Sequence, residues 1–420
     1  VTDAVVAGGH TSDGRYPMHS EEEERMEGGG PGPSRFDGRK LDKTSVDTYF
    51  HYYGMLAQQQ NMLQDYVRTG TYYAAVMENR HIFQGKVVVD VGAGTGILSL
   101  FAAMAGAKVV YAVEASDMAH HARQLCASNA SVGGDRVVVQ HCKVEDFKIP
   151  QSVGKADILI SEPMGTLLVN ERMIESYIAA RDQLLKPDGL MFPSYSRIHV
   201  ALFSDEYLHA EMVNKPQFWQ EENFYGLNLS CLYRDASKGY FEQVVVDVIC
   251  PDSLVDCSGP VTHPIDLTVT KEEDLHRIVI KLRYDNFDQP TSVHGLACWF
   301  DVDFATTGAA KKGTSHGVGG AHSFSRVPPV PKTLTTAPGS PTTHWCQLRC
   351  CLRDTLRVMP GQYIEGEMIL RANAKQSYDV DVSLVVVDPS GFWVGAPCKG
   401  TFDLKNPYYR QLLNFPPKTQ

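Results

Sequence analysis

The sequence predicts an α/β domain built on a parallel sheet, followed by an antiparallel β-barrel domain that a helical segment interrupts. Three observations predict this order. Between residues 87 and 190, short runs of β-branched residues alternate with helical stretches, as in parallel sheets with crossover helices. After Phe192 the chain contains alternating or β-rich runs separated by turns, which favours antiparallel sheet or a barrel. With 420 residues, the chain is long enough for two domains with cores of their own.

The composition is typical of a soluble globular protein, with 43% hydrophobic and 21% charged residues. The net charge of −10 argues against nonspecific nucleic-acid binding; it fits a basic partner, although solubility alone would also explain it.

The ten cysteines form no disulfide framework and no signal peptide is evident, which favours a reducing compartment. Cys346, Cys350 and Cys351 lack paired CxxC spacing, so we interpret them as strand residues rather than a metal site. The longest apolar stretch, 87–107, contains Asp90 and four glycines, which predicts a strand, a turn and a helix rather than a membrane span.

The elements of the first half follow in order. Residues 1–44 are rich in glutamate and glycine and are expected to be a disordered tail. A helix is expected from Ser45, its N-cap, to about Arg68, within a first domain assigned to 45–190. The expected strands are 87–91, 109–113, 137–140 and 158–160, and the expected helices are 97–105, 117–129 and 171–185. The sequence LysProAspGly at 186–189 predicts the turn that ends this half.

The second domain is assigned to 191–420. Its β-rich runs are 197–203, 244–249, 277–283, 296–304, 345–352 and 378–387. Residues 205–240 are predicted to be helical, with aromatic residues that look exposed. Residues 306–340 are rich in Gly, Ser, Thr and Pro, which predicts a long mobile loop.

A glycine-rich loop follows the first predicted strand and opens a helix. Gly92, Gly94 and Gly96 allow a sharp turn and a close approach of the backbone to a ligand. A dinucleotide fingerprint would place its third glycine at position 97, where this chain has Ile97. Glu114 ends the next strand, where a carboxylate can accept hydrogen bonds from ribose hydroxyls; the other interpretation is a solvated strand end. The loop with Glu114 therefore favours an adenosine ligand without a pyrophosphate.

Two glutamates follow the fourth predicted strand, at the carboxyl edge of the sheet, where ligands bind in open α/β folds. Glu162 and Glu171 bracket a short loop, and together they could bind a planar guanidinium cation. Carboxylates that hold the charge on one side of a guanidinium leave more electron density on its other terminal nitrogen. Positioning of that nitrogen against a methyl donor can contribute about 7–11 kcal/mol. The alternative is that Glu162 is a loop acid and that Glu171 only begins a helix.

Several stretches together resemble the protein arginine methyltransferases, from about Val46 to Arg410. They are TyrPheHisTyrTyr at 49–53, the glycine loop, ValGluAlaSer at 113–116, the double-glutamate loop at 161–171 and ThrHisTrp at 343–345. Within the family the chain is most similar to the coactivator-associated subfamily. The stretches that point there are 58–62, 65–72, 161–165 and 403–407. The resemblance implies a Rossmann-like domain that binds S-adenosylmethionine, a β-barrel domain with a dimerisation arm, and a type I product, asymmetric dimethylarginine.

The resemblance also implies roles for single residues. For the cofactor these are Arg68 at the methionine carboxylate, Glu114 at the ribose, Glu145 at the adenine, and Tyr49 and Tyr53 closing over it. For catalysis, Glu162 and Glu171 would hold the substrate arginine, and Met62 would lie by the target nitrogen. His344 would pair with Asp65, although a purely structural histidine fits equally well. The cofactor would be S-adenosylmethionine, with S-adenosylhomocysteine as product and no metal.

The resemblance extends to partners and location. It implies a homodimer formed through the arm at 205–240, and protein substrates such as histone tails and RNA-binding proteins. It implies residence in the nucleus and cytoplasm, with no direct nucleic-acid or membrane binding. Thr166 departs from the family, which usually has an aromatic residue there, and this could change which arginines are accepted.

Two alternatives compete with an active enzyme. A dehydrogenase is disfavoured by the glycine spacing and by the lack of a second nucleotide motif. A catalytically weak interaction protein that retains the fold is disfavoured by the presence of all the matching site residues, and Thr166 is the feature that favours it.

Overall fold

The computed structural model describes residues 41–304 and 328–410. The predicted disordered tail up to residue 40 and the first part of the predicted loop, up to residue 327, lie outside the described residues. Among those that are described, no helix is long and apolar enough to cross a membrane.

Four helices come before the first sheet. They are α1 (Lys43–Tyr53), α2 (Leu56–Gln64), α3 (Tyr66–Met77) and α4 (Arg80–Phe83). The prediction of one helix capped by Ser45 is wrong, because Asp42 is the N-cap and accepts hydrogen bonds from the backbone and hydroxyl of Ser45. Gly54 ends α1, and Asp65 leaves the helical conformation between α2 and α3. These breaks let α1 and α2 fold along the site instead of forming one rod.

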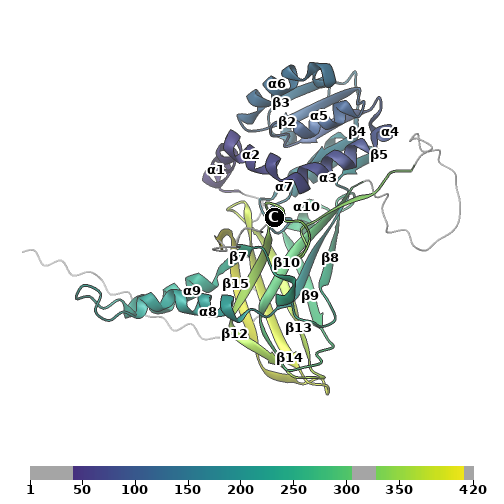
Figure 1. Cartoon of the computed structure of the whole chain (residues 1–420). Coiled ribbons are helices and arrows are strands. Elements are labelled where there is room, and N and C mark those ends of the chain that lie inside the picture. Colours follow the sequence, from purple (N-terminus) through teal and green to yellow (C-terminus); the bar gives the residue numbers. More distant parts are fainter. Residues whose placement is uncertain (1–40, 305–327, 411–420) are drawn as a thin grey trace, which may run out of the picture. The chain divides into compact units, whose positions relative to one another are not determined.

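The first sheet is parallel throughout, with the order β3-β2-β1-β4-β5 (Figure 1). Its strands are β1 (Val87–Val91), β2 (Val109–Glu114), β3 (Val137–His141), β4 (Ala156–Ser161) and β5 (Leu185–Phe192). The helices between them are α5 (Ile97–Met104), α6 (Met118–Ser128) and α7 (Met173–Leu184). This arrangement confirms the predicted α/β domain. The turn predicted at 186–189 lies instead within β5, where the register shifts from Ala156 opposite Leu185 to Ile158 opposite Leu190.

The second sheet has ten strands in a nearly closed barrel, as predicted. The order along it is β8-β6-β10-β12-β7-β15-β14-β13-β9, with β11 paired to β10. The bounds are β6 (Tyr195–Phe203), β7 (Gln243–Asp247), β8 (Val261–Asp266), β9 (Arg277–Tyr284), β10 (Thr291–Phe304), β11 (Lys332–Thr335), β12 (Gln347–Val358), β13 (Tyr363–Asn373), β14 (Ser377–Val387) and β15 (Trp393–Tyr409). The pairs are antiparallel except β7 with β15, which is parallel. β11 corrects the prediction of an unstructured loop through residue 340.

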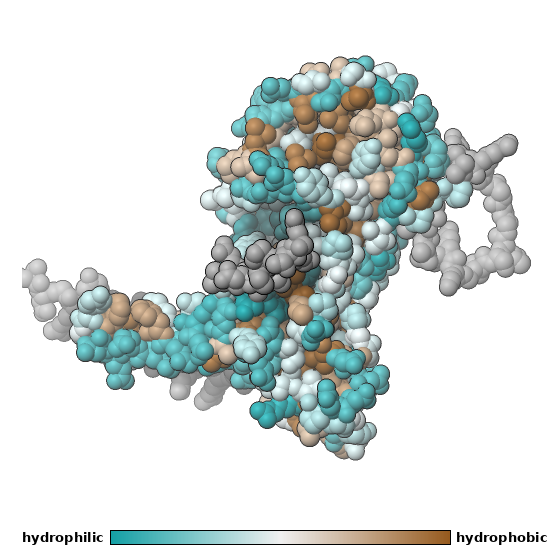
Figure 2. All heavy atoms as spheres, viewed as in Figure 1, coloured by the Kyte–Doolittle hydropathy of each residue, from teal (hydrophilic) through white to brown (hydrophobic). Residues whose placement is uncertain are grey.

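Helices interrupt the barrel strands, as the sequence predicted. They are α8 (Glu206–Asn214), α9 (Tyr233–Phe241) and the short α10 (Glu272–Leu275), with 3-10 turns between α8 and α9. Asp205 caps α8, and its carboxylate pairs with the buried Arg349 of β12 at 2.7 Å. The segment from α8 to α9 extends away from the ten-stranded sheet, and Figure 2 shows apolar atoms among its polar surface.

The two sheets share one buried core. The rings of Tyr72 on α3 and Phe304 on β10 lie 4.7 Å apart, and the indole of Trp345 donates to the backbone oxygen of Met164 at 3.1 Å. Cys350 and Cys351 lie buried in β12, whereas Cys346 comes just before this strand. The contacts between the sheets fix the loop after β4 against the barrel, which is where the candidate site lies.

Candidate active site

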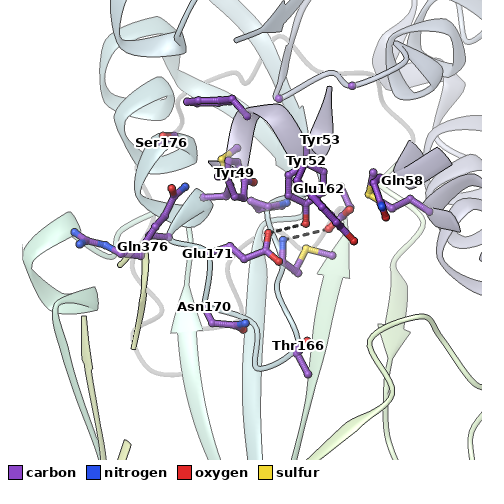
Figure 3. A pocket seen from close by; sticks show the side chains of 18 of the residues that line it. Tyr49, Tyr52, Tyr53, Gln58, Glu162, Thr166, Asn170, Glu171, Ser176 and Gln376 are labelled. Carbon is purple, nitrogen blue, oxygen red and sulfur yellow. Dashed lines mark hydrogen bonds between the residues drawn. The ribbon is translucent and has the colours of Figure 1, made fainter. Parts of the chain in front are cut away.

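The site is a cavity of about 1910 Å³, lined by residues from both sheets and from α1 and α2 (Figure 3). Twelve of the thirteen site residues predicted from the sequence line it. The exception is Gly96, which is the N-cap residue of α5. Pockets for single small ligands are typically about 300–1,000 Å³, so this one has room for two.

The glycine loop forms one wall of the cavity. Gly92, Gly94 and Gly96 have φ values of 69°, 53° and 83°, which favour glycine over residues with a side chain. A Cβ atom at Gly94 would lie 2.7 Å from the Gln59 side-chain oxygen. The loop therefore needs glycine for its turn, and the Gln59 side chain of α2 packs directly against it.

The Glu114 carboxylate is buried and organises this loop. It accepts hydrogen bonds from the backbone N–H groups of Gly94 at 2.8 Å and Ser116 at 2.7 Å. Glu114 is therefore not a solvated strand end, which was the alternative interpretation. Each of its oxygens can still accept a bond from a ligand hydroxyl. Glu145 lies exposed on the cavity lining, where it accepts a hydrogen bond from the Ser176 hydroxyl at 2.7 Å.

The double-glutamate loop is held in an unusual backbone conformation. Leu168, Glu171 and Arg172 all have positive φ, at 59°, 78° and 57°. Such residues are strained by about 1–3 kcal/mol each and persist only where the surroundings enforce them. The Asn170 side chain accepts from the Leu167 backbone at 2.7 Å, which closes the turn. The strained turn aims Glu171 back into the cavity that also contains Glu162.

Glu162 forms a buried ion pair with Arg68. The Nε and Nη2 atoms of Arg68 donate to one carboxylate oxygen of Glu162 at 2.9 and 2.8 Å. The resemblance assigns Arg68 to the cofactor and Glu162 to the substrate, whereas the structure pairs them with each other. Glu162 thus already holds one guanidinium, that of Arg68, through two hydrogen bonds to a single oxygen.

Glu171 is bonded to the tyrosines of α1. The Tyr53 hydroxyl donates to it at 2.9 Å, and the rings of Tyr49 and Tyr53 lie 4.7 Å apart (Figure 3). Burial raises the pKa of Glu171 to about 7, the charge of Glu162 adds to this shift, and the bond from Tyr53 opposes it. A cation between the two carboxylates would remove this repulsion.

His344 and Asp65 lie together on the cavity lining. The Asp65 carboxylate accepts from the ring of His344 at 2.7 Å and from its backbone N–H at 2.8 Å. It also accepts from the Arg68 backbone, and although burial raises the pKa of Asp65, these bonds hold it below its ordinary value. The backbone oxygen of Met62 accepts a bond from Arg68 at 3.2 Å. The pair thus connects the barrel to α3 and to the Arg68–Glu162 ion pair.

Some lining residues were not predicted. Arg172, Gln376, Lys405 and Tyr409 line the cavity, and the last three come from the carboxyl-terminal half of the barrel. Positive φ and burial identify Arg172 and Gln376 as unusual, but neither property is visible in a single sequence. Thr166, the departure from the family pattern, is half-buried on the cavity lining.

Two family models match this chain. Residues 194–386 match the arginine methyltransferase oligomerization subdomain, and residues 69–194 match the ribosomal protein L11 methyltransferase (PrmA) model. The boundary between the two matches lies at the junction of β5 and β6.

Among curated proteins, the chain is 53% identical over 383 residues to probable histone-arginine methyltransferase 1.3 of Arabidopsis thaliana, covering 90% of this chain and 66% of that protein. It is also 53% identical to the probable histone-arginine methyltransferase CARM1 of Oryza sativa subsp. japonica, covering 90% and 67%. The histone-arginine methyltransferase CARMER of Anopheles gambiae is 43% identical, with 88% and 54% covered. The chain thus spans about two thirds of the length of the plant relatives.

Solved structures show the same fold. Protein arginine methyltransferase 10 of Arabidopsis thaliana matches with a TM-score of 0.72 and 29% identity, over 85% of this chain and 100% of that one. The PRMT1 enzyme–prozyme heterotetrameric complex of Trypanosoma brucei with AdoHcy matches with a TM-score of 0.66 and 30% identity, over 84% and 99%.

Proposed function

The chain belongs to the protein arginine methyltransferase family, and we propose that it transfers methyl groups from S-adenosylmethionine to arginine side chains of histones and other proteins. The observation that carries this proposal is the convergence of Glu162 and Glu171 on one cavity beside the glycine loop. A dehydrogenase would need a different loop spacing, and a protein without activity would not need the strained turn that aims Glu171 inward.

The residues present fit an adenosine cofactor without phosphates. Gly92 and Gly94 bring their backbone to the cavity lining with φ values that favour glycine, Glu114 offers acceptors for the ribose, and Glu145, assigned to the adenine, also lies on the cavity lining. S-adenosylmethionine supplies an electrophilic methyl group on a sulfonium centre. Tyr49 and Tyr53 on α1 would cover the bound cofactor and exclude water. Arg68 would turn part of its hydrogen bonding from Glu162 to the cofactor carboxylate.

The two glutamates would bind and orient the substrate guanidinium. Ionised Glu162 and Glu171 hold its charge on one side, which leaves the remaining terminal nitrogen free to point at the methyl group. That nitrogen loses a proton during the transfer. His344 lies on the cavity lining and is paired with Asp65, and we assign the acceptance of this proton to it; a structural role in holding α3 is its alternative.

We further propose a type I product, monomethylarginine followed by asymmetric dimethylarginine. The support is the similarity to proteins named CARM1 and the place of Met62 in the cavity lining. The flexible thioether of a methionine can move aside for a nitrogen that already carries one methyl group. We also propose a homodimer that works in the nucleus and cytoplasm, because the relatives are named histone methyltransferases and 194–386 match an oligomerization subdomain.

Product analysis tests the proposal. The purified chain is incubated with S-adenosylmethionine and recombinant histone H3, and acid hydrolysates are analysed by mass spectrometry. Asymmetric dimethylarginine is expected, and the Glu162→Gln variant serves as the inactive control. Symmetric dimethylarginine would overturn the type I assignment alone, and the absence of any methylarginine on H3 or on lysate proteins would overturn the proposed activity.

A further inference from the structure

Gln376 has three properties that the activity described above does not explain. It lies in the turn between β13 and β14, it is 6% exposed, and its φ is +56°. Residues with a Cβ rarely adopt this conformation, and a strained residue often marks a functional site. Its side-chain oxygen Oε1 is buried and has no hydrogen-bond partner. A buried acceptor without a partner is unfavourable unless a ligand satisfies it.

The turn that carries Gln376 is fixed from two sides. The Arg172 guanidinium donates to the backbone oxygen of Asn373 at 3.1 Å, and the backbone N–H of Asp42, ahead of α1, donates to that of Ala374 at 2.8 Å. The backbone just ahead of Gln376 is therefore held by the end of the double-glutamate loop and by the start of α1. These are the same two elements that carry Glu171 and Tyr53.

Gln376 also lies on the cavity lining. Figure 3 draws it among the side chains of the same cavity as Glu171 and Glu162. It belongs to the ten-stranded sheet, whereas the glycine loop and Glu114 belong to the five-stranded one. None of the residues assigned to the cofactor comes from the ten-stranded sheet, so we assign Gln376 to the second ligand.

A side-chain amide carries an NH2 group, which donates, and a carbonyl oxygen, which accepts, so it can pair with the C=O and N–H of a peptide backbone. This protein already uses that match elsewhere. The Asn79 side chain donates to the backbone oxygen of Val330 at 2.8 Å and accepts from its N–H at 2.7 Å. We propose that Gln376 binds a backbone peptide group of the protein substrate next to the target arginine. This inference rests on the proposed function, because it takes the second ligand to be a polypeptide.

Two substitutions separate this role from a structural one. Gln376→Gly and Gln376→Asn can both adopt the positive φ at little cost, but only the second keeps an amide. Both variants are expected to melt at or above the wild-type temperature. If the role of Gln376 is purely structural, the two variants should have equal KM and kcat values.

The readouts are KM and kcat for a histone H3 tail peptide, and the dissociation constant of S-adenosylhomocysteine by calorimetry. Gln376→Gly is expected to raise KM about fivefold, as for the loss of one neutral hydrogen bond, with kcat and cofactor affinity unchanged. Gln376→Asn is expected to lie between this variant and the wild type. An unchanged KM in Gln376→Gly would overturn the inference, and so would weaker S-adenosylhomocysteine binding, which would assign the amide to the cofactor.

Failure of the proposed function gives a different pattern. Binding of the fluorescently labelled peptide is therefore also measured by anisotropy, without any turnover. A wild type that methylates nothing but binds the peptide more tightly than Gln376→Gly would leave the inference standing while the activity fails. If the wild type is active but binds the peptide no more tightly than Gln376→Gly, the proposed activity stands and the inference about Gln376 fails.

Discussion

The Tyr53 hydroxyl on α1 donates a 2.9 Å hydrogen bond to Glu171, which lies 118 residues further along the chain. This bond links the helix expected to close over the cofactor to the carboxylate expected to hold the substrate. Because the bond favours the ionised form of Glu171, it also opposes the effect of burial on the pKa of that group. The position of α1 and the charge of the substrate site are thus coupled.

Tyr53→Phe is expected to lower kcat/KM for a peptide about tenfold at pH 7. Without the donor, the pKa of Glu171 rises further above about 7, so less of it is ionised when the guanidinium arrives. The acidic limb of the pH–rate profile should therefore move to higher pH. Tyr52→Phe is the matched control, because Tyr52 is the neighbouring residue on the same helix and is 45% exposed. An identical profile for Tyr53→Phe and wild type would contradict the coupling.

Binding of the substrate arginine is expected to release a proton from Glu171 below about pH 7. The guanidinium needs an ionised partner, so peptide affinity should rise with pH and level off above about 7. The enthalpy of peptide binding, measured by calorimetry in buffers with different ionisation enthalpies, reports the number of protons released. A buffer-independent enthalpy at pH 6 would show that Glu171 is already ionised.

The raised pKa of Glu171 also affects the stability of the protein without a bound substrate. The folded state holds this proton more tightly than the unfolded chain, in which the ordinary value near 4.5 applies. The corresponding contribution to the free energy of unfolding is complete below pH 4.5 and is lost as the pH rises through about 7. Urea unfolding between pH 5 and 8 should therefore show a larger decrease with pH for the wild type than for Glu171→Gln.

Glu171→Gln is expected to lower kcat at least about a hundredfold while S-adenosylhomocysteine binding survives. The amide keeps the size of the side chain but loses the charge that orients the guanidinium. Single-turnover methyl transfer and calorimetric cofactor binding measure the two effects separately. Turnover near the wild-type level would contradict a mechanism that uses both glutamates.

Local patterns sufficed to predict the parallel sheet. The run Val87–Val91 and the glycines after it describe a buried strand and a tight turn through their own residue types, and the structure has a strand with these bounds. The start of β5 could not be predicted in this way, because LysProAspGly at 186–189 has turn residues yet lies within the strand, in a register shift between Leu185 and Leu190, which both pair with β4. Tertiary pairing overrides local propensity there.

The candidate site could likewise be predicted only in part from the sequence. Glu162 and Glu171 stand in one motif, so sequence could bring them together, but their neighbours come from distant segments. Nothing local indicates that Arg68 pairs with Glu162, 94 residues away, or that Gln376 reaches the cavity. Such contacts depend on how the barrel packs against the loop after β4, which sequence periodicity does not specify.

Arg172→Met is expected to destabilise the protein by about 3 kcal/mol and to lower activity. Its buried guanidinium pairs with Glu175 at 2.7 and 2.8 Å, and removal of one partner leaves a carboxylate in a poorly solvated place. The double variant Arg172→Met/Glu175→Met should recover much of the stability but not the activity, because the tie to Asn373 that supports the strained Glu171 stays broken. Melting curves and kcat for these two variants and for Glu175→Met alone complete the cycle. If stability and activity recover together, Arg172 has no part in placing Glu171.

The segment between α8 and α9 is expected to hold two copies of the chain together. Its exposed apolar residues include Tyr225 and Leu227, which are 92% and 65% exposed. Deletion of residues 205–240 should give a monomer with little activity, but it also removes Asp205, whose carboxylate pairs with the buried Arg349. The double variant Tyr225→Asn/Leu227→Asn avoids this damage, since asparagine tolerates the positive φ of Tyr225. Sedimentation equilibrium should show a monomer with an almost unchanged melting temperature, and a dimer in this variant and in the deletion would contradict the assignment of the arm.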